Sequence, residues 1–289
     1  MITYTVYSEA GGTYKTTTTA NTAVAHARDG LDVLAIDMDP QEGSLSYIFD
    51  VDERKKEGDA DNLVRHMIDR PNGDFEDLVR STDEGVDVIP SHAMLENLSS
   101  LLDRAQEIEE MSHGADDYEY DRYQQLHRVL AENDVPEEYD VVMVDPQATA
   151  SDALYNAIFA TRTLVSPVEL SGKGSLSLDG LDDLVWNLES ELGIEVGVAA
   201  VVPGNVGRTR ANARYRQELE DAGWDVPVVV GERESMMQEM WDAQASAFTV
   251  VEDAYVDGEP GERREREREQ DTLEKYRELA DHVESTFRR

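Results

Sequence analysis

Short apolar runs of strand length alternate along the chain with stretches in which apolar residues recur at helical spacing. The runs cover residues 2–7, 33–37, 86–89, 141–145, 163–168, 195–202 and 226–230. The clearest helical pattern lies over residues 16–28, where Ala20, Ala23, Val24 and Ala27 share one face. Strands buried on both faces and alternating with helices are typical of a parallel sheet. We therefore predict an α/β fold with a doubly wound, mostly parallel sheet and helices on both faces.

The same pattern predicts one domain over residues 1–255, with a linker and a C-terminal helix over 256–289 packed on it. An acidic stretch over 106–138 interrupts the regular alternation, and we expect two solvated helices there around a loop at 112–117. The last helix carries an apolar stripe at helical spacing, formed by Leu273, Tyr276, Leu279, Ala280, Val283 and Phe287.

Composition narrows the class of protein. The 289 residues contain no cysteine, which excludes thiol catalysis, disulfides and cysteine-ligated zinc or iron–sulfur sites. Hydrophobic residues make up 40%, enough to bury a core, yet no run reaches the roughly 18 apolar residues of a membrane span. Because the chain enters strand-like sequence directly, we expect no signal peptide and a cytoplasmic location.

The chain is strongly acidic, with 63 Asp and Glu against 26 Lys and Arg, a net charge of −37. Such a charge argues against polyanionic partners at ordinary salt. The acid is spread along the whole chain and lysine is scarce, a composition similar to that of proteins from salt-in extreme halophiles. At molar salt the Debye length is about 3 Å, so self-repulsion costs little. An unusually acidic protein from an ordinary habitat is the alternative.

Residues 8–17, SEAGGTYKTT, occupy the turn between the first strand and the first helix. Backbone N–H groups of a glycine-containing turn and the positive end of the following helix can cradle a polyphosphate. Lys15 would reach the β- and γ-phosphates and the Thr16 hydroxyl would bind Mg²⁺. The predicted nucleotide-binding residues of the loop are Gly11, Gly12, Thr13, Tyr14, Lys15, Thr16 and Thr17. An ordinary glycine-rich turn with a chance Lys-Thr pair is the alternative.

Two carboxylate motifs end later strands. Asp37-Met-Asp39-Pro-Gln closes the second apolar run, and Asp145-Pro-Gln closes the run over 141–145. Carboxylates at the carboxyl ends of parallel strands face the crevice in which ligands bind. We expect Asp145 to bind the nucleotide and, with Thr16 and Asp39, to hold Mg²⁺, the carboxylates acting through water. Lys15 and Asp39 are the predicted catalytic residues, Asp39 orienting or activating the attacking water.

The order of these segments resembles the ParA/MinD family of deviant Walker A P-loop ATPases, over residues 2 to about 250. The matching positions are Gly11, Gly12, Lys15, Thr16, Thr17, Asp37, Asp39, Pro40, Gln41, Asp145, Pro167, Gly180 and Leu181. The Pro-Gln after Asp39 fits the ParA branch better than the MinD branch. The resemblance implies an ATP- and Mg²⁺-dependent homodimerising switch that hydrolyses ATP slowly. Such switches segregate plasmids or chromosomes or position other cargo, with non-specific DNA and a ParB-like stimulating protein as partners and a nucleoid-associated location.

The phosphate loop departs from the family pattern at two positions. Ala10 stands where the family has its signature lysine, and Tyr14 where it has the glycine before the P-loop lysine. Glu9 adds negative charge beside the loop. Tyr14 could stack on the nucleotide or pack on the first helix, and Arg208, Arg210 or Lys173 could replace the missing lysine. These departures leave open a nucleotide-binding adaptor with impaired hydrolysis, or a MinD-like positioning protein.

A cluster of arginines makes DNA a candidate partner. The candidate DNA-binding residues are Arg208, Arg210, Arg214, Arg216 and Arg233. Arginine–phosphate contacts supply most of the affinity in sequence-independent DNA binding. The alternative is a solvated helix whose arginines pair with the abundant glutamates. The last helix lacks a lysine-rich polar face, so we expect it to pack on the domain rather than on a membrane.

Overall fold

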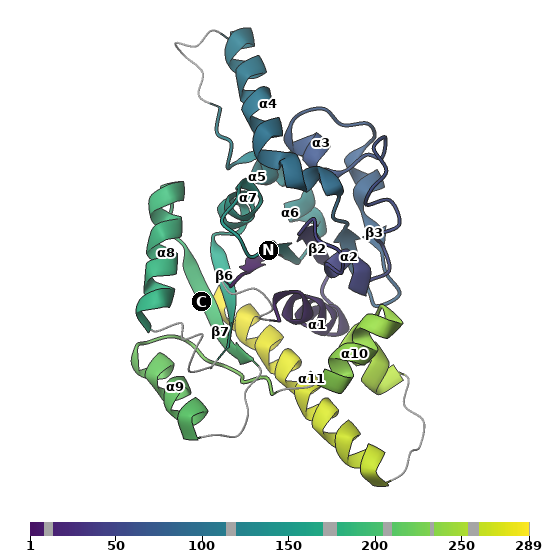
Figure 1. Cartoon of the computed structure of the whole chain (residues 1–289), viewed down its shortest axis with the longest axis vertical. Coiled ribbons are helices and arrows are strands. Elements are labelled where there is room, and N and C mark those ends of the chain that lie inside the picture. The colour runs from purple at the N-terminus through teal and green to yellow at the C-terminus, as the bar shows by residue number, and fades with distance from the viewer. Residues whose placement is uncertain are drawn as a thin grey trace.

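A seven-stranded sheet forms the centre of the computed structural model, which describes residues 1–8, 14–113, 120–169, 178–204, 210–231, 234–253 and 260–288 (Figure 1). The strand order is β3-β4-β2-β5-β1-β6-β7. The strands are β1 (Ile2–Val6), β2 (Val33–Met38), β3 (Arg80–Ser81), β4 (Val86–Ile89), β5 (Val141–Pro146), β6 (Thr163–Glu169) and β7 (Gly197–Gly204). Neighbours pair in parallel except β3, which is antiparallel to β4. The predicted α/β fold is confirmed.

Helices cover both faces of this sheet. They are α1 (Lys15–Arg28), α2 (Leu45–Ile48), α3 (Leu63–Met67), α4 (Leu98–His113), α5 (Gln125–Glu132), α6 (Val135–Glu138), α7 (Asp152–Thr161), α8 (Leu178–Leu192), α9 (Arg210–Asp221), α10 (Glu234–Ala243) and α11 (Pro260–Phe287). Along β2, Val33 and Ala35 join the core beneath α1, α10 and α11, while Leu34 and Ile36 join the core beneath α3, α4, α5 and α7. Alternate side chains thus bury opposite faces, which accounts for the continuous apolar runs.

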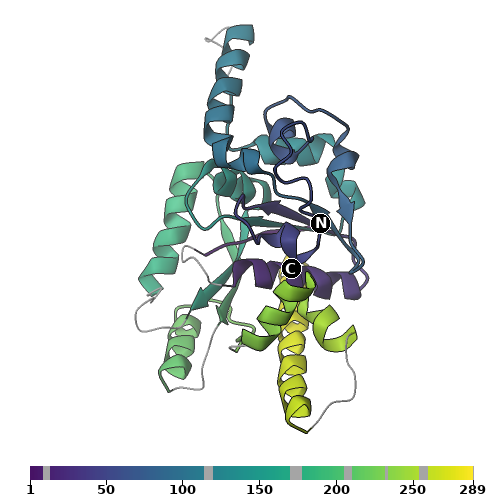
Figure 2. The same ribbon diagram turned by 45° about the vertical axis from the view of Figure 1, so that its right-hand side comes forward.

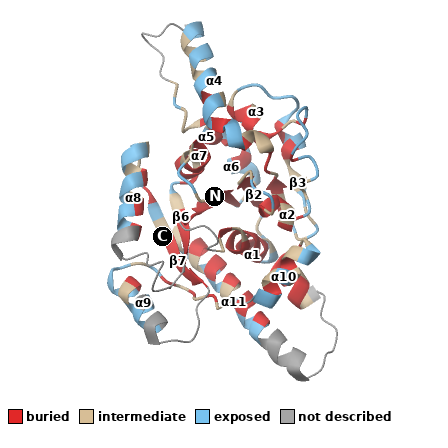
Figure 3. Ribbon diagram, viewed as in Figure 1, coloured by how far each residue is buried: buried red, intermediate tan, exposed pale blue. Residues whose placement is uncertain are grey.

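The acidic stretch is less solvated than predicted. Helix α5 buries Leu126, Val129 and Leu130 in the core, because its apolar residues recur on one face. The outer part of α4 is exposed and projects from the body of the molecule (Figure 3). This part of the stretch fits the expectation of a solvated helix.

Residues 226–230 form no strand of the sheet, contrary to the prediction. The Val230 N–H donates to the Pro203 carbonyl over 2.8 Å, so the segment runs beside β7 without a full ladder. Pro227 has no N–H to donate, which prevents regular pairing. Strand β3, only two residues long, was not predicted.

The C-terminal helix α11 packs against α1, as the two views of Figures 1 and 2 show. Five residues of its predicted stripe are buried, namely Leu273, Tyr276, Leu279, Ala280 and Val283. A buried polar chain joins the two helices to the sheet: the Tyr4 hydroxyl lies 3.1 Å from His26 Nε2, and His26 Nδ1 lies 3.0 Å from Glu284 Oε1. None of the helices in the described ranges is both long and apolar enough to span a membrane.

Candidate functional site

Three adjacent strands, β2, β5 and β1, bring the predicted phosphate-chemistry residues to one edge of the sheet. Asp37 on β2 and Asp145 on β5 are register partners. Lys15 opens α1, the helix that follows β1. Because all three strands are parallel, their carboxyl ends meet at the same edge, and the charges of Lys15, Asp37 and Asp39 all act on Asp145.

Tyr14 precedes α1 in a left-handed conformation, with φ 58° and ψ 19°. This backbone is one that glycine adopts freely and that costs another residue about 1–2 kcal/mol. The Tyr14 ring lies against Gly204 at the end of β7. The two are so close that a Cβ added to Gly204 would lie 3.2 Å from the ring. The ring therefore packs on a strand end, a position that the sequence analysis did not consider. Glu9, Ala10, Gly11, Gly12 and Thr13 lie outside the described residues.

Lys15 and the two threonines after it form the first turn of α1. Lys15 is 8% exposed, and no described carboxylate forms a salt bridge with its ammonium group. Thr16 is half-buried and Thr17 is buried. A positive charge at the start of a helix, without an anionic partner, suits the binding of a phosphate.

Asp145 is a buried carboxylate to which the described part of the chain offers no hydrogen bond. It is 1% exposed, and neither of its side-chain oxygens has a partner of acceptable geometry among the described residues. Burial, with the charges of Asp37 and Asp39, raises the pKa of Asp145 to about 8, although the nearby Thr16 hydroxyl and Lys15 act in the opposite direction. Unpartnered buried oxygens call for a missing ligand. A Mg²⁺ ion with its bound water fits this donor set.

Asp37, by contrast, is fully hydrogen-bonded. Its Oδ2 accepts from the Ser46 N–H at 2.8 Å and the Ser46 hydroxyl at 2.5 Å, and its Oδ1 accepts from the Asp39 N–H at 3.0 Å. Burial raises the pKa of Asp37, and these hydrogen bonds oppose the rise. Its role in the structure is to fix the start of the loop that carries Asp39.

The loop over residues 39–44 places Asp39 at the edge of the site. One Asp39 carboxylate oxygen accepts the Gln41 N–H at 2.9 Å, and the Asp39 carbonyl accepts the Ser91 hydroxyl at 2.5 Å. The Lys55 ammonium donates to the Gln41 carbonyl and, over 3.0 Å, to the Ser44 hydroxyl. Sequence reasoning missed Lys55 and Ser91. The available signal was that Lys55 is one of only five lysines in the chain.

Of the five candidate DNA-binding arginines, the structure describes the side chains of Arg214 and Arg216. On α9, Arg214 pairs with Glu218 at 3.1 Å and Arg216 with Glu220 at 2.8 Å. Such pairs match the alternative of a solvated helix. Arg208 and Arg233 lie outside the described residues, and the structure describes only the backbone of Arg210. Lys173 also lies outside.

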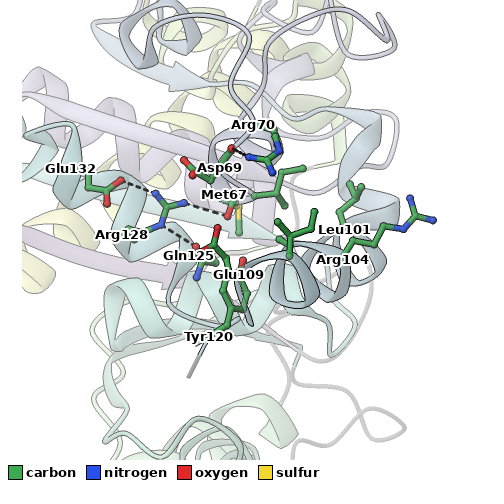
Figure 4. A pocket seen from close by; sticks show the side chains of 13 residues that line it. Met67, Asp69, Arg70, Leu101, Arg104, Glu109, Tyr120, Gln125, Arg128 and Glu132 are labelled. Carbon is green, nitrogen blue, oxygen red and sulfur yellow. Dashed lines mark hydrogen bonds and ion pairs between the residues drawn. The ribbon is translucent and has the colours of Figure 1, made fainter. Parts of the chain in front are cut away.

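A separate cavity of about 390 Å³ lies between α3, α4 and α5 (Figure 4). Arg128 is its central cation. The guanidinium donates to the His66 carbonyl at 2.9 Å and to Gln125 Oε1 at 3.0 Å, and it pairs with Glu132 at 2.7 Å. These contacts cap the carboxyl end of α3 and neutralise the charge, so Arg128 is not free to bind an anion.

Comparison with known protein families identifies the family to which the chain belongs. The model described as an AAA domain (AAA_31) matches residues 1–191, so the chain belongs to this family. An uncharacterized protein from Mycobacterium tuberculosis is 26% identical over 227 residues, covering 76% of this chain and 65% of that protein. The chain matches 60% and 65% of the lengths of the first curated relatives.

Solved structures share the fold over almost the whole chain. The septum site-determining protein MinD from Pyrococcus horikoshii, complexed with Mg-ADP, has a TM-score of 0.69 and 18% identity, covering 98% of this chain and 95% of that one. A plasmid partition protein from Borrelia burgdorferi has a TM-score of 0.67 and 16% identity, covering 98% of both chains. Cobyrinic acid a,c-diamide synthase from Mycobacterium smegmatis, with ADP and magnesium, has a TM-score of 0.68 and 18% identity, covering 97% and 93%.

The resemblance to the ParA/MinD family of P-loop ATPases is thus confirmed for the fold. The MinD and partition structures resemble this chain equally well, so the assignment to the ParA branch stays a prediction. The synthase shows that the same fold also serves a different chemistry.

Proposed function

We propose that this protein is a MgATP-dependent switch that hydrolyses ATP slowly and acts in plasmid or chromosome partition or in cargo positioning. One observation carries the proposal: the Asp145 carboxylate, unpartnered among the described residues, lies near enough to the start of α1 for the charge of Lys15 to act on it. Lys15 and the loop before it would hold the phosphates, with Thr16, Asp145 and Asp39 around the metal. Bound Mg²⁺ would neutralise phosphate charge and polarise the γ-phosphoryl group. No three His, Asp or Glu residues in the described ranges group into a metal site of their own, so phosphate oxygens would complete the shell.

The comparisons support this assignment through the fold and through the nucleotides named for two of the similar structures. Homodimerisation with nucleotide, contact with non-specific DNA and a stimulating ParB-like partner belong to the proposal. Nucleoid association would follow from the DNA contact. At molar salt, the arginines of residues 207–216 would need close contact with phosphates, because counterion release then contributes little.

A second candidate is a nucleotide-binding adaptor that has lost turnover. The left-handed backbone at Tyr14 favours it, because the residue that replaces the glycine strains the loop that must wrap the phosphates. Ala10, in place of the signature lysine, removes the charge that the family places at the dimer interface. A MinD-like positioning protein is the third candidate, supported by the equal structural similarity.

Nucleotide binding, phosphate release and oligomer mass, measured in molar KCl and at low salt, test the proposal. The variants are Lys15→Ala and, as a matched control, Lys56→Ala, an exposed lysine outside the site. We expect wild type and Lys56→Ala to bind MgATP, dimerise and release phosphate, and Lys15→Ala to lose about 100-fold or more in affinity. Binding without turnover in wild type would favour the adaptor. Absence of nucleotide binding by wild type would overturn both.

A further inference from the structure

Lys55 is a buried lysine in a turn 16 residues beyond Asp39, and only 6% of it is exposed. Its ammonium group contacts the loop over residues 39–44 three times. It donates to the Gln41 carbonyl, to the Ser44 hydroxyl at 3.0 Å and, weakly, to the Asp39 carbonyl at 3.5 Å. No described carboxylate forms a salt bridge with it. A buried ammonium group needs several acceptors, and here two loop carbonyls and the Ser44 hydroxyl supply them.

The turn that carries Lys55 is itself fixed. The Lys55 carbonyl accepts the Ala93 N–H at 2.9 Å, and the Lys55 N–H donates to the Asp52 carbonyl at 3.1 Å. The two residues before Ala93 continue from β4, where Ser91 donates its hydroxyl to the Asp39 carbonyl at 2.5 Å and its N–H to the Ser46 hydroxyl at 2.8 Å. Lys55 and Ser91 therefore both hold this loop, and the segment over residues 91–93 also holds the turn that carries Lys55.

We infer that Lys55 is a positioning residue for Asp39: by gathering the loop carbonyls around its ammonium group, it sets the place of the Asp39 carboxylate at the edge of the site. Asp39 is near enough to Asp145 for its charge to be felt there. The kinetic part of this inference rests on the proposed ATPase function. The structural part, that Lys55 holds residues 39–44, does not.

Lys56 provides a matched control. It is the neighbouring lysine and it reaches the same loop, pairing with Glu42 at 2.5 Å, but its side chain is 75% exposed. An exposed pair of this kind contributes little to stability. Comparing variants of Lys55 and Lys56 therefore separates the effect of a buried ammonium group from the effect of a lysine that merely lies near the loop.

Backbone hydrogen exchange over residues 39–44, measured without nucleotide, tests the structural part in wild type, Lys55→Met and Lys56→Met. We expect Lys55→Met to exchange at least about tenfold faster there, with α1 and β5 unchanged, and Lys56→Met to match wild type. Unchanged exchange in Lys55→Met would overturn the inference whether or not the protein hydrolyses ATP. If Lys55→Met does not fold, Lys55→Gln, which keeps a donor without the charge, is measured with the same criterion.

A double-mutant cycle with Asp39→Ala tests the kinetic part. Lys55→Met should lower turnover about tenfold while the Kd for MgATP changes less than about threefold. In the Asp39→Ala background the same substitution should change turnover less than about twofold, because both act through one carboxylate. Equal losses in both backgrounds would overturn the link to Asp39. Wild type without turnover would instead count against the proposed function, and the exchange result would still decide on Lys55.

Discussion

The two ends of α1 carry buried polar clusters of opposite character. Near its start, where the charge of Lys15 acts on it, Asp145 has both carboxylate oxygens unpartnered among the described residues. At its other end, His26 is bonded on both ring nitrogens, to Tyr4 and to Glu284. A satisfied cluster stabilises the fold, whereas an unsatisfied one stores a cost that a ligand can relieve. The difference supports the proposal that the start of α1 is the site of the chemistry, whereas the other end attaches α11.

Neutralising the Asp145 carboxylate gives the largest expected effect and tests whether the two ends of α1 differ in function. Asp145→Asn should remove about 100-fold of the gain in nucleotide affinity that Mg²⁺ confers, because the metal loses its anionic oxygen. Calorimetric titration of ATP with and without Mg²⁺ measures the gain. An Asn variant that keeps the full Mg²⁺ effect would show that the metal binds elsewhere.

The same variant should change how stability depends on pH. The raised pKa of Asp145, about 8, lies above the value of an exposed aspartate, so the folded state keeps a proton that the unfolded state has already lost. Stability from this group is therefore present at low pH and declines as pH rises from about 4 through about 8. Denaturation of the ligand-free protein across this range should show the decline in wild type and not in Asp145→Asn. If the stability of both proteins depended on pH in the same way, the raised pKa assigned to Asp145 would be contradicted.

We expect the cluster around His26, at the other end of α1, to affect the stability of the fold and not the binding of nucleotide. Glu284→Ala leaves the buried His26 ring without one partner, and we expect a loss of about 1–3 kcal/mol in the free energy of unfolding with little change in nucleotide affinity. Glu278→Ala, which breaks an exposed pair with Lys275 on the same helix, is the control and should cost less than about 1 kcal/mol. A large loss of nucleotide affinity in Glu284→Ala would erase the distinction between the two ends.

Tyr14 offers the smallest expected effect. Tyr14→Gly and Tyr14→Ala both lose the ring that packs on Gly204, but only glycine adopts the left-handed backbone without strain. We expect the glycine variant to be about 1 kcal/mol more stable than the alanine variant. Equal stabilities, measured by denaturant unfolding, would show that the backbone relaxes when the ring is removed.

The clusters at the two ends of α1 also show how much of the fold and of the candidate site could be predicted from the sequence. Apolar runs located most strands, and the motifs at Lys15, Asp37 and Asp145 follow from strand ends that any parallel sheet brings to one edge. The contact of Tyr14 with Gly204, and the reach of Lys55 into the loop after Asp39, depend on tertiary packing that no local pattern encodes. Nothing in the sequence around His26 pointed to its contact with Glu284, 258 residues away.

Proton release on nucleotide binding tests the central claim most directly. Because burial raises the pKa of Asp145 to about 8, we expect its carboxyl to carry a proton at pH 7 in the ligand-free protein, and a bound Mg²⁺ requires the carboxylate. Calorimetric titration of MgATP in two buffers of different ionisation enthalpy should show release of up to about one proton at pH 7, much less at about pH 9.5, and none in Asp145→Asn. Binding heats at pH 7 that are independent of the buffer in wild type would contradict the account.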